Sequence, residues 1–180
     1  MVSAPSGCGK TTIRNKLASI FPNLASSISM TTRPPRSNEV EGKDYYFVSK
    51  KDFLEHNRNG ELLEWACNFG HLYGTPRSAV QKAIREGKDI LLTIDVKGAK
   101  KVKMAIPGSI HIFLMPPSIY DLEKRLKKRG TDNAKDIHKR LNVARREIEE
   151  ARRYDYIVVN DSIKSAVSKL KSIIEAEKKE

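Results

Sequence analysis

The stretch that decides the fold is Ser3-Ala-Pro-Ser-Gly-Cys-Gly-Lys-Thr-Thr12, near the start of the chain. It follows an apolar stub at Met1–Ser3 and precedes a helical pattern over Lys10–Phe21, which predicts a strand, a glycine-rich loop and a helix. Glycines in such a loop let backbone N–H groups converge on phosphate oxygens, and the helix presents its positive N-terminus to the same anion. The pattern GxxxxGK[ST] indicates a nucleotide-binding loop in which Lys10 reaches the β- and γ-phosphates and the Thr11 hydroxyl ligates Mg²⁺.

Two features of this stretch depart from that interpretation. Ala4 stands where the first glycine of the pattern is usual, and Cys8 and Arg14 have the C-x5-R spacing of cysteine-dependent phosphatases. The phosphatase chemistry needs a thiolate at the centre of the loop, activated by backbone N–H groups. A loop that places Lys10 correctly leaves Arg14 a full turn into the helix, so we favour the nucleotide loop over the phosphatase.

Composition excludes several other classes. The 180 residues suit one domain, and with 39% hydrophobic and 31% charged residues no apolar run approaches the ~20 that a membrane span needs. There is no signal-peptide pattern, and the two cysteines form no zinc-type spacing. We therefore expect a cytoplasmic protein without disulfide or structural metal. The net charge of +12 attracts polyanions, but aromatic residues do not alternate with the basic ones, which argues against nucleic-acid binding.

Apolar runs alternate with helical patterns, which predicts an α/β fold with a parallel sheet. Expected strands are Met1–Ser3, Ser26–Met30, Ile90–Ile94, Ile110–Leu114 and Tyr156–Val159; expected helices are Lys10–Phe21, Arg77–Glu86, Ser118 to Arg129, Ile137 to Ala151 and Ile163 to Ile174. Residues 32–75 break the alternation, because they are rich in Tyr, Phe, Trp and Gly, with short β-like pieces around a helix starting near Ser49. Their composition predicts an insert that carries a binding surface.

Beyond the loop, six stretches in order resemble guanylate kinases along nearly the whole chain: SAPSGCGKTT, SMTTRPPRSNEVEGKDYYFV, ELLEWACNFGHLYGTP, LLTIDVKGAKKVK, MPPSIYDLEKRLKKRGTD and IVVNDS. The resemblance implies one domain with a P-loop kinase core of parallel β-sheet flanked by helices (1–31, 76–124 and 154–180). A mixed α/β GMP-binding insert (32–75) and a helical lid (125–153) complete the expected fold. It also implies transfer of the γ-phosphoryl group of ATP to GMP, and to dGMP, giving the nucleoside diphosphate, as part of purine nucleotide metabolism.

The resemblance also implies which residues form the site. It assigns catalysis to Lys10, Arg125, Arg129 and Arg140; ATP binding to Ala4, Pro5, Ser6, Gly7, Cys8, Gly9, Lys10, Thr11, Thr12, Arg129 and Asn160; and the metal, Mg²⁺, to Thr11 with the substrate phosphates and waters. It assigns GMP binding to Ser29, Arg33, Arg36, Tyr45, Glu64, Tyr73, Thr75 and Asp95. Transfer to a phosphate acceptor needs cations rather than a strong general base, which fits four histidines in no triad or metal spacing.

Two departures and three alternatives stay open. Thr93 replaces the acidic residue usual in the family, which predicts weaker metal affinity or turnover, and the first expected strand is so short that the natural start is expected upstream. A ribose-bisphosphate kinase shares a similar core, but the set Ser29, Glu64 and Thr75 argues against it. A non-catalytic protein-binding module is disfavoured by the intact Gly9, Lys10 and Thr11, and RNA binding rests on net charge alone. We expect ATP and GMP as partners of a monomer or homodimer, without nucleic acid or membrane.

Overall fold

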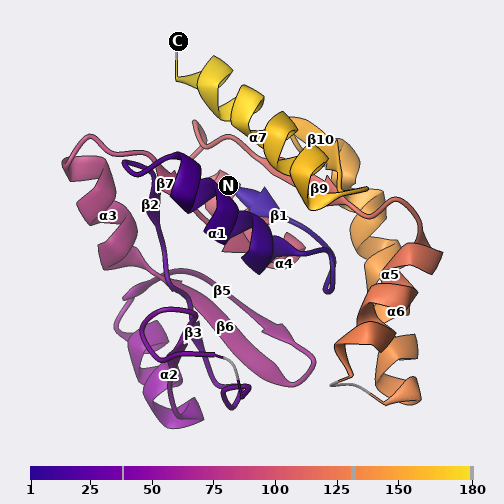
Figure 1. Cartoon of the computed structure of the whole chain (residues 1–180). Coiled ribbons are helices and arrows are strands. Elements are labelled where there is room, and N and C mark those ends of the chain that lie inside the picture. Colours follow the sequence, from indigo (N-terminus) through magenta and orange to yellow (C-terminus); the bar gives the residue numbers. More distant parts are fainter. Residues whose placement is uncertain (38, 131–132, 179–180) are drawn as a thin grey trace. The chain divides into compact units, whose positions relative to one another are not determined.

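The computed structural model describes residues 1–37, 39–130 and 133–178, and of Arg129 only the backbone. Internal contacts divide the chain into two compact units. Unit 1 comprises Met1–Pro22, Thr93–Val96 and Ile110–Glu180, and unit 2 comprises Asn23–Leu92 and Lys97–Ser109. Most elements of both units are labelled in Figure 1.

Unit 1 is built on a four-stranded parallel sheet in the order β10-β9-β1-β8. Its strands are β1 (Val2–Ser3), β8 (Thr93–Ile94), β9 (Ile112–Met115) and β10 (Tyr156–Val159). Although β1 has two residues, both of its edges are paired, because Val2 lies opposite Thr93 on one side and Ile112 on the other. This short strand therefore occupies a central place in the sheet and fixes where the following loop begins.

Helices accompany this sheet: α1 (Lys10–Ile20), α5 (Ile119–Arg129), α6 (Ala134–Glu149), the 3₁₀ helix η1 (Glu150–Arg153) and α7 (Ile163–Glu177). In Figure 1, α7 lies beside α1, and α5 lies beside α6. Their starts are set by side-chain caps, since Ser118, Asn133 and Ser162 each accept a hydrogen bond from the backbone N–H three residues on. Phe113 is fully buried in the core and meets the ring of Tyr154 edge-on at 5.1 Å.

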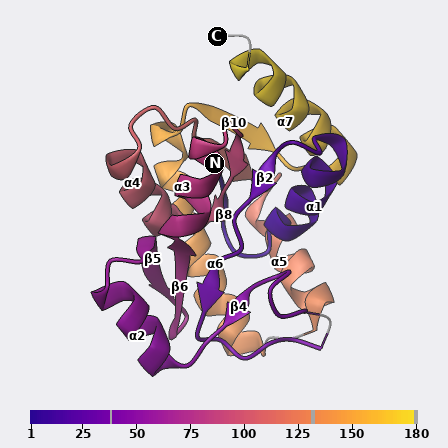
Figure 2. The same cartoon turned by 90° about the vertical axis from the view of Figure 1, so that its left-hand side faces the viewer.

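Unit 2 contains a mixed four-stranded sheet in the order β4-β3-β6-β5 and a separate parallel pair, β2 with β7. The strands are β2 (Ala25–Ser26), β3 (Met30–Thr31), β4 (Tyr46–Phe47), β5 (Leu62–Asn68), β6 (His71–Pro76) and β7 (Ile90–Leu91). The helices are α2 (Lys50–Arg58), α3 (Arg77–Arg85) and, apart from its first residue, α4 (Val96–Ala105). Strands β5 and β6 form an antiparallel hairpin, and Figure 2 shows α2 beside it.

Close packing joins α2 to this hairpin. Phe53 of α2 is fully buried, and a Cβ added at Gly74 of β6 would lie 3.0 Å from its Cζ and 2.9 Å from Leu62 Cδ1. Only glycine allows this approach without a shift of the neighbours. The helix begins after Ser49, whose hydroxyl accepts from the N–H of Asp52. Phe53, Leu62 and Gly74 thus pack together within unit 2.

The expected α/β fold with a parallel sheet and accompanying helices is confirmed, including the helix starts at Ser49 and Ser118. Two expected strands are wrong in detail. The run Ile90–Ile94 forms two short strands because β7 pairs with β2 whereas β8 pairs with β1, and Ser26–Met30 is divided between β2 and β3 for a similar reason. Among the described helices, none is long and apolar enough to cross a bilayer.

Candidate functional site

The loop of unit 1 joins the end of β1 to the start of α1. Gly7 and Gly9 have φ angles of +94° and +86°, in the region that residues with a side chain rarely adopt. At Gly7 space is limiting as well, because an added Cβ would lie 2.9 Å from Leu126 Cδ2. Gly9 is the N-cap of α1 and no side chain caps the helix, so the first N–H groups of α1 face the loop as an anion site.

Cationic side chains gather at this loop. Lys10 Nζ donates to the carbonyl oxygen of Ala4, so its ammonium group lies folded over the loop. Arg140 of α6 donates from Nη1 to Ser6 Oγ at 2.8 Å, which brings a predicted lid arginine to the loop within unit 1. Thr11 and Thr12 are exposed on the first turn of α1. The loop thus combines backbone donors, a lysine and an arginine, a set that suits a polyphosphate.

Asn160, which follows β10, supports the loop from inside. Its side chain is fully buried, and Nδ2 donates to the carbonyl oxygen of Cys8 at 2.8 Å. Its Oδ1 has no hydrogen-bond partner among the described residues. Arg125 of α5 donates from Nη2 to the Asn160 carbonyl oxygen at 2.8 Å. In this arrangement the predicted adenine-side residue holds the loop backbone, a contact that sequence patterns do not reveal.

The side chain of Cys8 is buried within the protein. This burial raises the pKa of its thiol to about 11 although Lys10 and Arg125 act in the opposite direction. A phosphatase needs the reverse, a thiol whose pKa is lowered by its surroundings. Arg14 lies on α1 and donates from Nε to Asn15 Oδ1 at 3.2 Å. The geometry excludes the C-x5-R interpretation.

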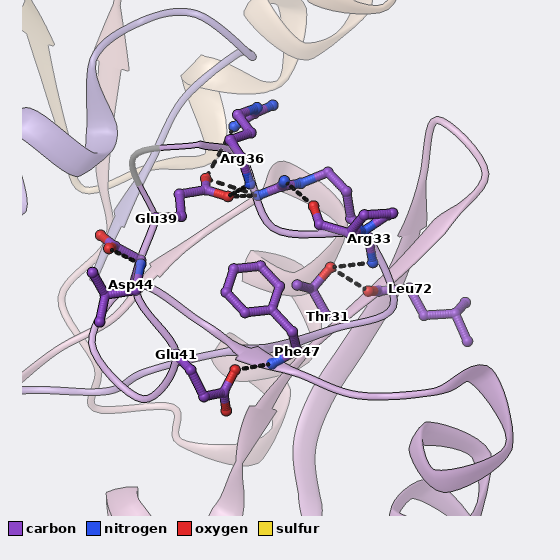
Figure 3. Close-up of polar contacts among 10 residues, drawn as sticks. Thr31, Arg33, Arg36, Glu39, Glu41, Asp44, Phe47 and Leu72 are labelled. Atoms are coloured by element: carbon purple, nitrogen blue, oxygen red, sulfur yellow. Dashed lines mark hydrogen bonds and ion pairs between the residues drawn. The ribbon is translucent and has the colours of Figure 1, made fainter.

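The second cluster lies in unit 2 and consists of arginines among aromatic rings. The guanidinium carbon of Arg33 lies 5.5 Å from the ring centroid of Tyr45, and Tyr45 meets Tyr73 edge-on at 6.0 Å. The Arg33 N–H donates to Thr31 Oγ1 at 3.2 Å, which fixes the turn after β3 (Figure 3). Burial works against the charge of Arg33, but hydrogen bonds with Glu39 and Tyr73 outweigh it and raise the pKa of the arginine.

A buried carboxylate lies on the same sheet. Glu64 of β5 is 6% exposed, and its Oε1 accepts from Thr75 Oγ1 of β6 at 2.7 Å. The two residues are register partners in the hairpin, next to an irregularity of β5 between Leu62 and Glu64. A buried carboxylate is costly unless hydrogen bonds satisfy it, and it can accept from two adjacent donors of a ligand. Ser29, half-buried before β3, accepts at its carbonyl oxygen from the Tyr46 N–H at 2.9 Å.

The predicted residues thus fall into two sets. The predicted ATP residues, Arg125 and Arg140 belong to unit 1, whereas the predicted GMP residues belong to unit 2 with one exception. That exception is Asp95, which belongs to unit 1, where its charge helps burial to raise the pKa of Tyr154 to about 12. The side chain of Arg129 lies outside the described residues. Among the residues described, no group of three or more His, Cys, Asp or Glu could hold a metal ion.

Arg33, Arg36, Tyr45 and Tyr73 together form what we call the arginine cluster. One further residue of this cluster was missed by the sequence patterns. Glu39 bonds to both Arg33 and Arg36, and its side chain is 12% exposed. The signal was an acidic residue three positions after Arg36 in a basic, proline-containing turn. Such a spacing by itself does not distinguish a buried ion pair from an ordinary surface charge.

The chain matches known proteins along its length. The family model described as guanylate kinase matches residues 1–177. A guanylate kinase of Lactobacillus acidophilus is 49% identical over 179 residues, which cover 98% of this chain and 87% of that protein. A guanylate kinase of Desulfitobacterium hafniense is 47% identical over 178 residues, 99% of this chain and 89% of that protein. The crystal structure of guanylate kinase from Anaplasma phagocytophilum superposes with a TM-score of 0.83 at 38% identity and covers 98% of this chain and 83% of that one.

Proposed function

The chain belongs to the guanylate kinase family, which transfers the γ-phosphoryl group of ATP to GMP, and we propose that the loop of unit 1 holds ATP while unit 2 holds GMP. The observation that carries this assignment is the buried pair of Glu64 and Thr75, because Thr75 lies on β6, the strand that also carries Tyr73 beside the arginines. A carboxylate there accepts from N1–H and the 2-amino group of guanine, an arrangement of donors that adenine lacks. Unit 2 therefore has a base-reading group and phosphate-binding cations together.

For ATP we assign the backbone of Ala4 to Thr12, with Lys10 neutralising the β- and γ-phosphates. The ammonium of Lys10 already lies at the loop, where a phosphate oxygen replaces the Ala4 carbonyl as its partner. Arg140, Arg125 and Arg129 supply further positive charge from the helices, and Asn160 supports the loop beneath the adenine side. Mg²⁺ keeps waters and substrate phosphates as ligands, so a single protein oxygen, Thr11 Oγ1, is a fitting contribution.

For GMP we assign the phosphate to Arg33, Arg36, Tyr45 and Tyr73, and the guanine to Ser29, Glu64 and Thr75, with Asp95 on the ribose or metal side. Arginine forks suit a phosphate dianion, and tyrosine hydroxyls add directed donors. The buried Nε of Arg33 has no hydrogen-bond partner among the described residues, which leaves a donor for such a ligand. dGMP presents the same base and phosphate and is expected to react as well.

Phosphoryl transfer requires the protein to position the two substrates and to neutralise charge. The acceptor is already a phosphate oxyanion, so no residue needs to remove a proton from it. The task is to bring two polyanions into line and to neutralise the charge that moves between them, which lysine and arginine do. Bound Mg²⁺ adds charge stabilisation on the transferred group. We assign closure over the substrates to the insert 32–75 and the lid 125–153 around a core of 1–31, 76–124 and 154–180.

A coupled assay tests the proposal directly. ATP and Mg²⁺ are combined in turn with GMP, dGMP, AMP, CMP and UMP, and ADP formation is followed. We expect turnover with GMP and dGMP and at least about 100-fold lower kcat/KM with the other bases, because those bases do not present the two adjacent donors of guanine to the Glu64 carboxylate. Turnover of AMP in preference to GMP would contradict the guanine assignment. We place this activity in the cytoplasm, in a monomer or homodimer.

A further inference from the structure

Glu39 lies at the centre of the arginine cluster (Figure 3). Its Oε1 and Oε2 each lie 2.8 Å from Arg33 Nη2. Oε2 also accepts from the backbone N–H of Arg36 at 2.9 Å, and Oε1 accepts from Arg36 Nη1 at 3.2 Å. The backbone closes the same turn, since the Glu39 N–H donates to the Arg36 carbonyl oxygen at 3.0 Å. One carboxylate therefore bonds to both guanidinium groups and to the chain between them.

These contacts restrain the guanidinium group of Arg33 and leave one of its nitrogens without a partner among the described residues. Arg33 Nη1 donates to the Pro34 carbonyl oxygen and Nη2 to Glu39, whereas Nε is buried without a partner among the described residues. Phe47, like Tyr45, lies close to this guanidinium, with its ring centroid 5.8 Å away. The plane of the Arg33 guanidinium is thus fixed by hydrogen-bond partners on two of its nitrogens and by neighbouring rings. The third nitrogen keeps a donor for an incoming anion.

The charges explain why the carboxylate is needed. Two guanidinium groups repel each other where burial weakens solvent screening. Burial alone would raise the pKa of Glu39, but hydrogen bonds from the Arg36 backbone and Arg33, with the charges of both arginines, lower it. Glu39 is therefore ionised at neutral pH. Two cations and one anion leave a net charge of about +1 for the dianionic phosphate.

We propose that Glu39 is a positioning residue, which holds the guanidinium groups of Arg33 and Arg36 before GMP binds in the orientation that receives its phosphate. This inference rests on the proposed function, in which these arginines bind that phosphate. An already oriented pair of cations loses less side-chain freedom when the ligand arrives, so the gain appears in the affinity for GMP.

A competing role makes the opposite prediction. If Glu39 stood in for the phosphate, GMP would have to displace it, and its removal would strengthen GMP binding. The hydrogen bonds favour positioning, because the carboxylate also accepts from the Arg36 backbone N–H and so belongs to the turn itself. Displacement would break that bond and both guanidinium contacts together, and Arg33 Nε is free to bind phosphate without it.

The test compares Glu39→Gln with the matched control Glu41→Gln. Glu41 lies two residues away, is exposed, and accepts from the Phe47 N–H at 2.9 Å, a bond that the glutamine oxygen retains. Calorimetry gives the Kd of each protein for GMP and for guanosine, which lacks the phosphate. We expect Glu39→Gln to weaken GMP binding by about 10- to 100-fold, as loss of a supporting residue commonly does, and to leave guanosine binding within about twofold. The control should leave both unchanged.

A second arm shows that Glu39 acts through the arginines. In a protein that already carries Arg33→Ala and Arg36→Ala, adding Glu39→Gln should cause no further loss of GMP affinity. Unchanged or tighter GMP binding by Glu39→Gln alone, or an equal loss for guanosine, would overturn the positioning role while the phosphate site stands. If the two arginine substitutions leave the GMP Kd unchanged, the phosphate assignment itself is wrong, and the positioning role fails with it.

Discussion

The two proposed anion sites of this protein are built by opposite means. In unit 1 a continuous loop offers backbone N–H groups, positive φ angles at Gly7 and Gly9 and the start of α1. In unit 2 the site is made of side chains from separate segments, in which Arg33 and Arg36 are held by a carboxylate and Tyr45 and Tyr73 lie close by. The first site depends on backbone shape, and the second on the charge and orientation of side chains.

Because of this difference, substitutions are expected to have different effects at the two sites. A loop built from backbone donors loses little when an adjacent side chain changes, provided the glycines and the lysine remain. A side-chain cluster loses affinity when any member or its support is removed, because the remaining buried charges are left without partners. The following predictions probe one site at a time, in order of decreasing effect.

The largest effect is expected at the loop lysine. Lys10→Ala should lower kcat by about 10²- to 10³-fold, the usual loss when one donor that stabilises developing charge is removed. Steady-state kinetics with varied ATP measures it, and KM for GMP should change little. The control is Lys16→Ala, an exposed lysine on the same helix. An equal loss in both variants would mean that general charge, rather than the position of Lys10, matters.

The next effect concerns the base. Glu64→Gln should lower kcat/KM for GMP by about 10- to 100-fold, since an amide offers one acceptor where guanine presents two donors. The ratio of GMP to AMP turnover measures it, with Thr75→Ser as the control that keeps the hydroxyl donating to Glu64. If the GMP preference survives in Glu64→Gln, the base is read by other residues.

A smaller effect is expected from support of the loop. Asn160→Ala removes the hydrogen bond to the buried Cys8 carbonyl oxygen and should lower the free energy of unfolding by about 1–3 kcal/mol. Urea denaturation measures it, and Asn142→Ala on the exposed face of α6 is the control. Equal stability of the two variants would show that Asn160 does not hold the loop.

The smallest effect is a dependence of stability on alkaline pH. The Cys8 thiol has a pKa of about 11 when folded and about 9 in an exposed reference state, so between these values the unfolded chain loses a proton that the folded chain keeps. Stability is therefore complete below pH ~9 and falls by about 1 kcal/mol per pH unit toward pH ~11 as this group titrates. Tyr154, with a pKa of about 12, adds to the decline.

Denaturation curves from pH 8 to 11 measure this decline, and Cys8→Ala should show a shallower slope than the unmodified protein whatever its absolute stability. Equal slopes would mean that the buried thiol does not titrate as its surroundings require. Cys67→Ala, at the exposed cysteine, is the control substitution.

The contrast between the sites also explains which features could be predicted from the sequence. The loop was readable because its residues are contiguous and their spacing follows from the geometry of one turn, and the capping serines predicted where α2 and α5 begin. The division of Ile90–Ile94 into two strands was not readable, because it depends on which distant strand each half pairs with.

The same reason explains the two residues whose contacts were missed. Glu39 and Asn160 act through hydrogen bonds to residues that the sequence pattern assigns to other tasks. Glu39 lies three residues from Arg36, a common spacing for surface charges, and only its burial shows that it supports the cluster. Asn160 is separated from Cys8 by 152 positions in the chain, so no local pattern connects them.

The central claim is that ATP and GMP occupy separate sites of opposite construction. Calorimetric titration of a non-hydrolysable ATP analogue and of GMP, each alone, into Lys10→Ala and Arg33→Ala tests it most directly. We predict that Lys10→Ala weakens the analogue by about tenfold or more and leaves the GMP Kd within about twofold, and that Arg33→Ala does the reverse. Loss of both ligands in either variant, at unchanged thermal stability, would contradict it.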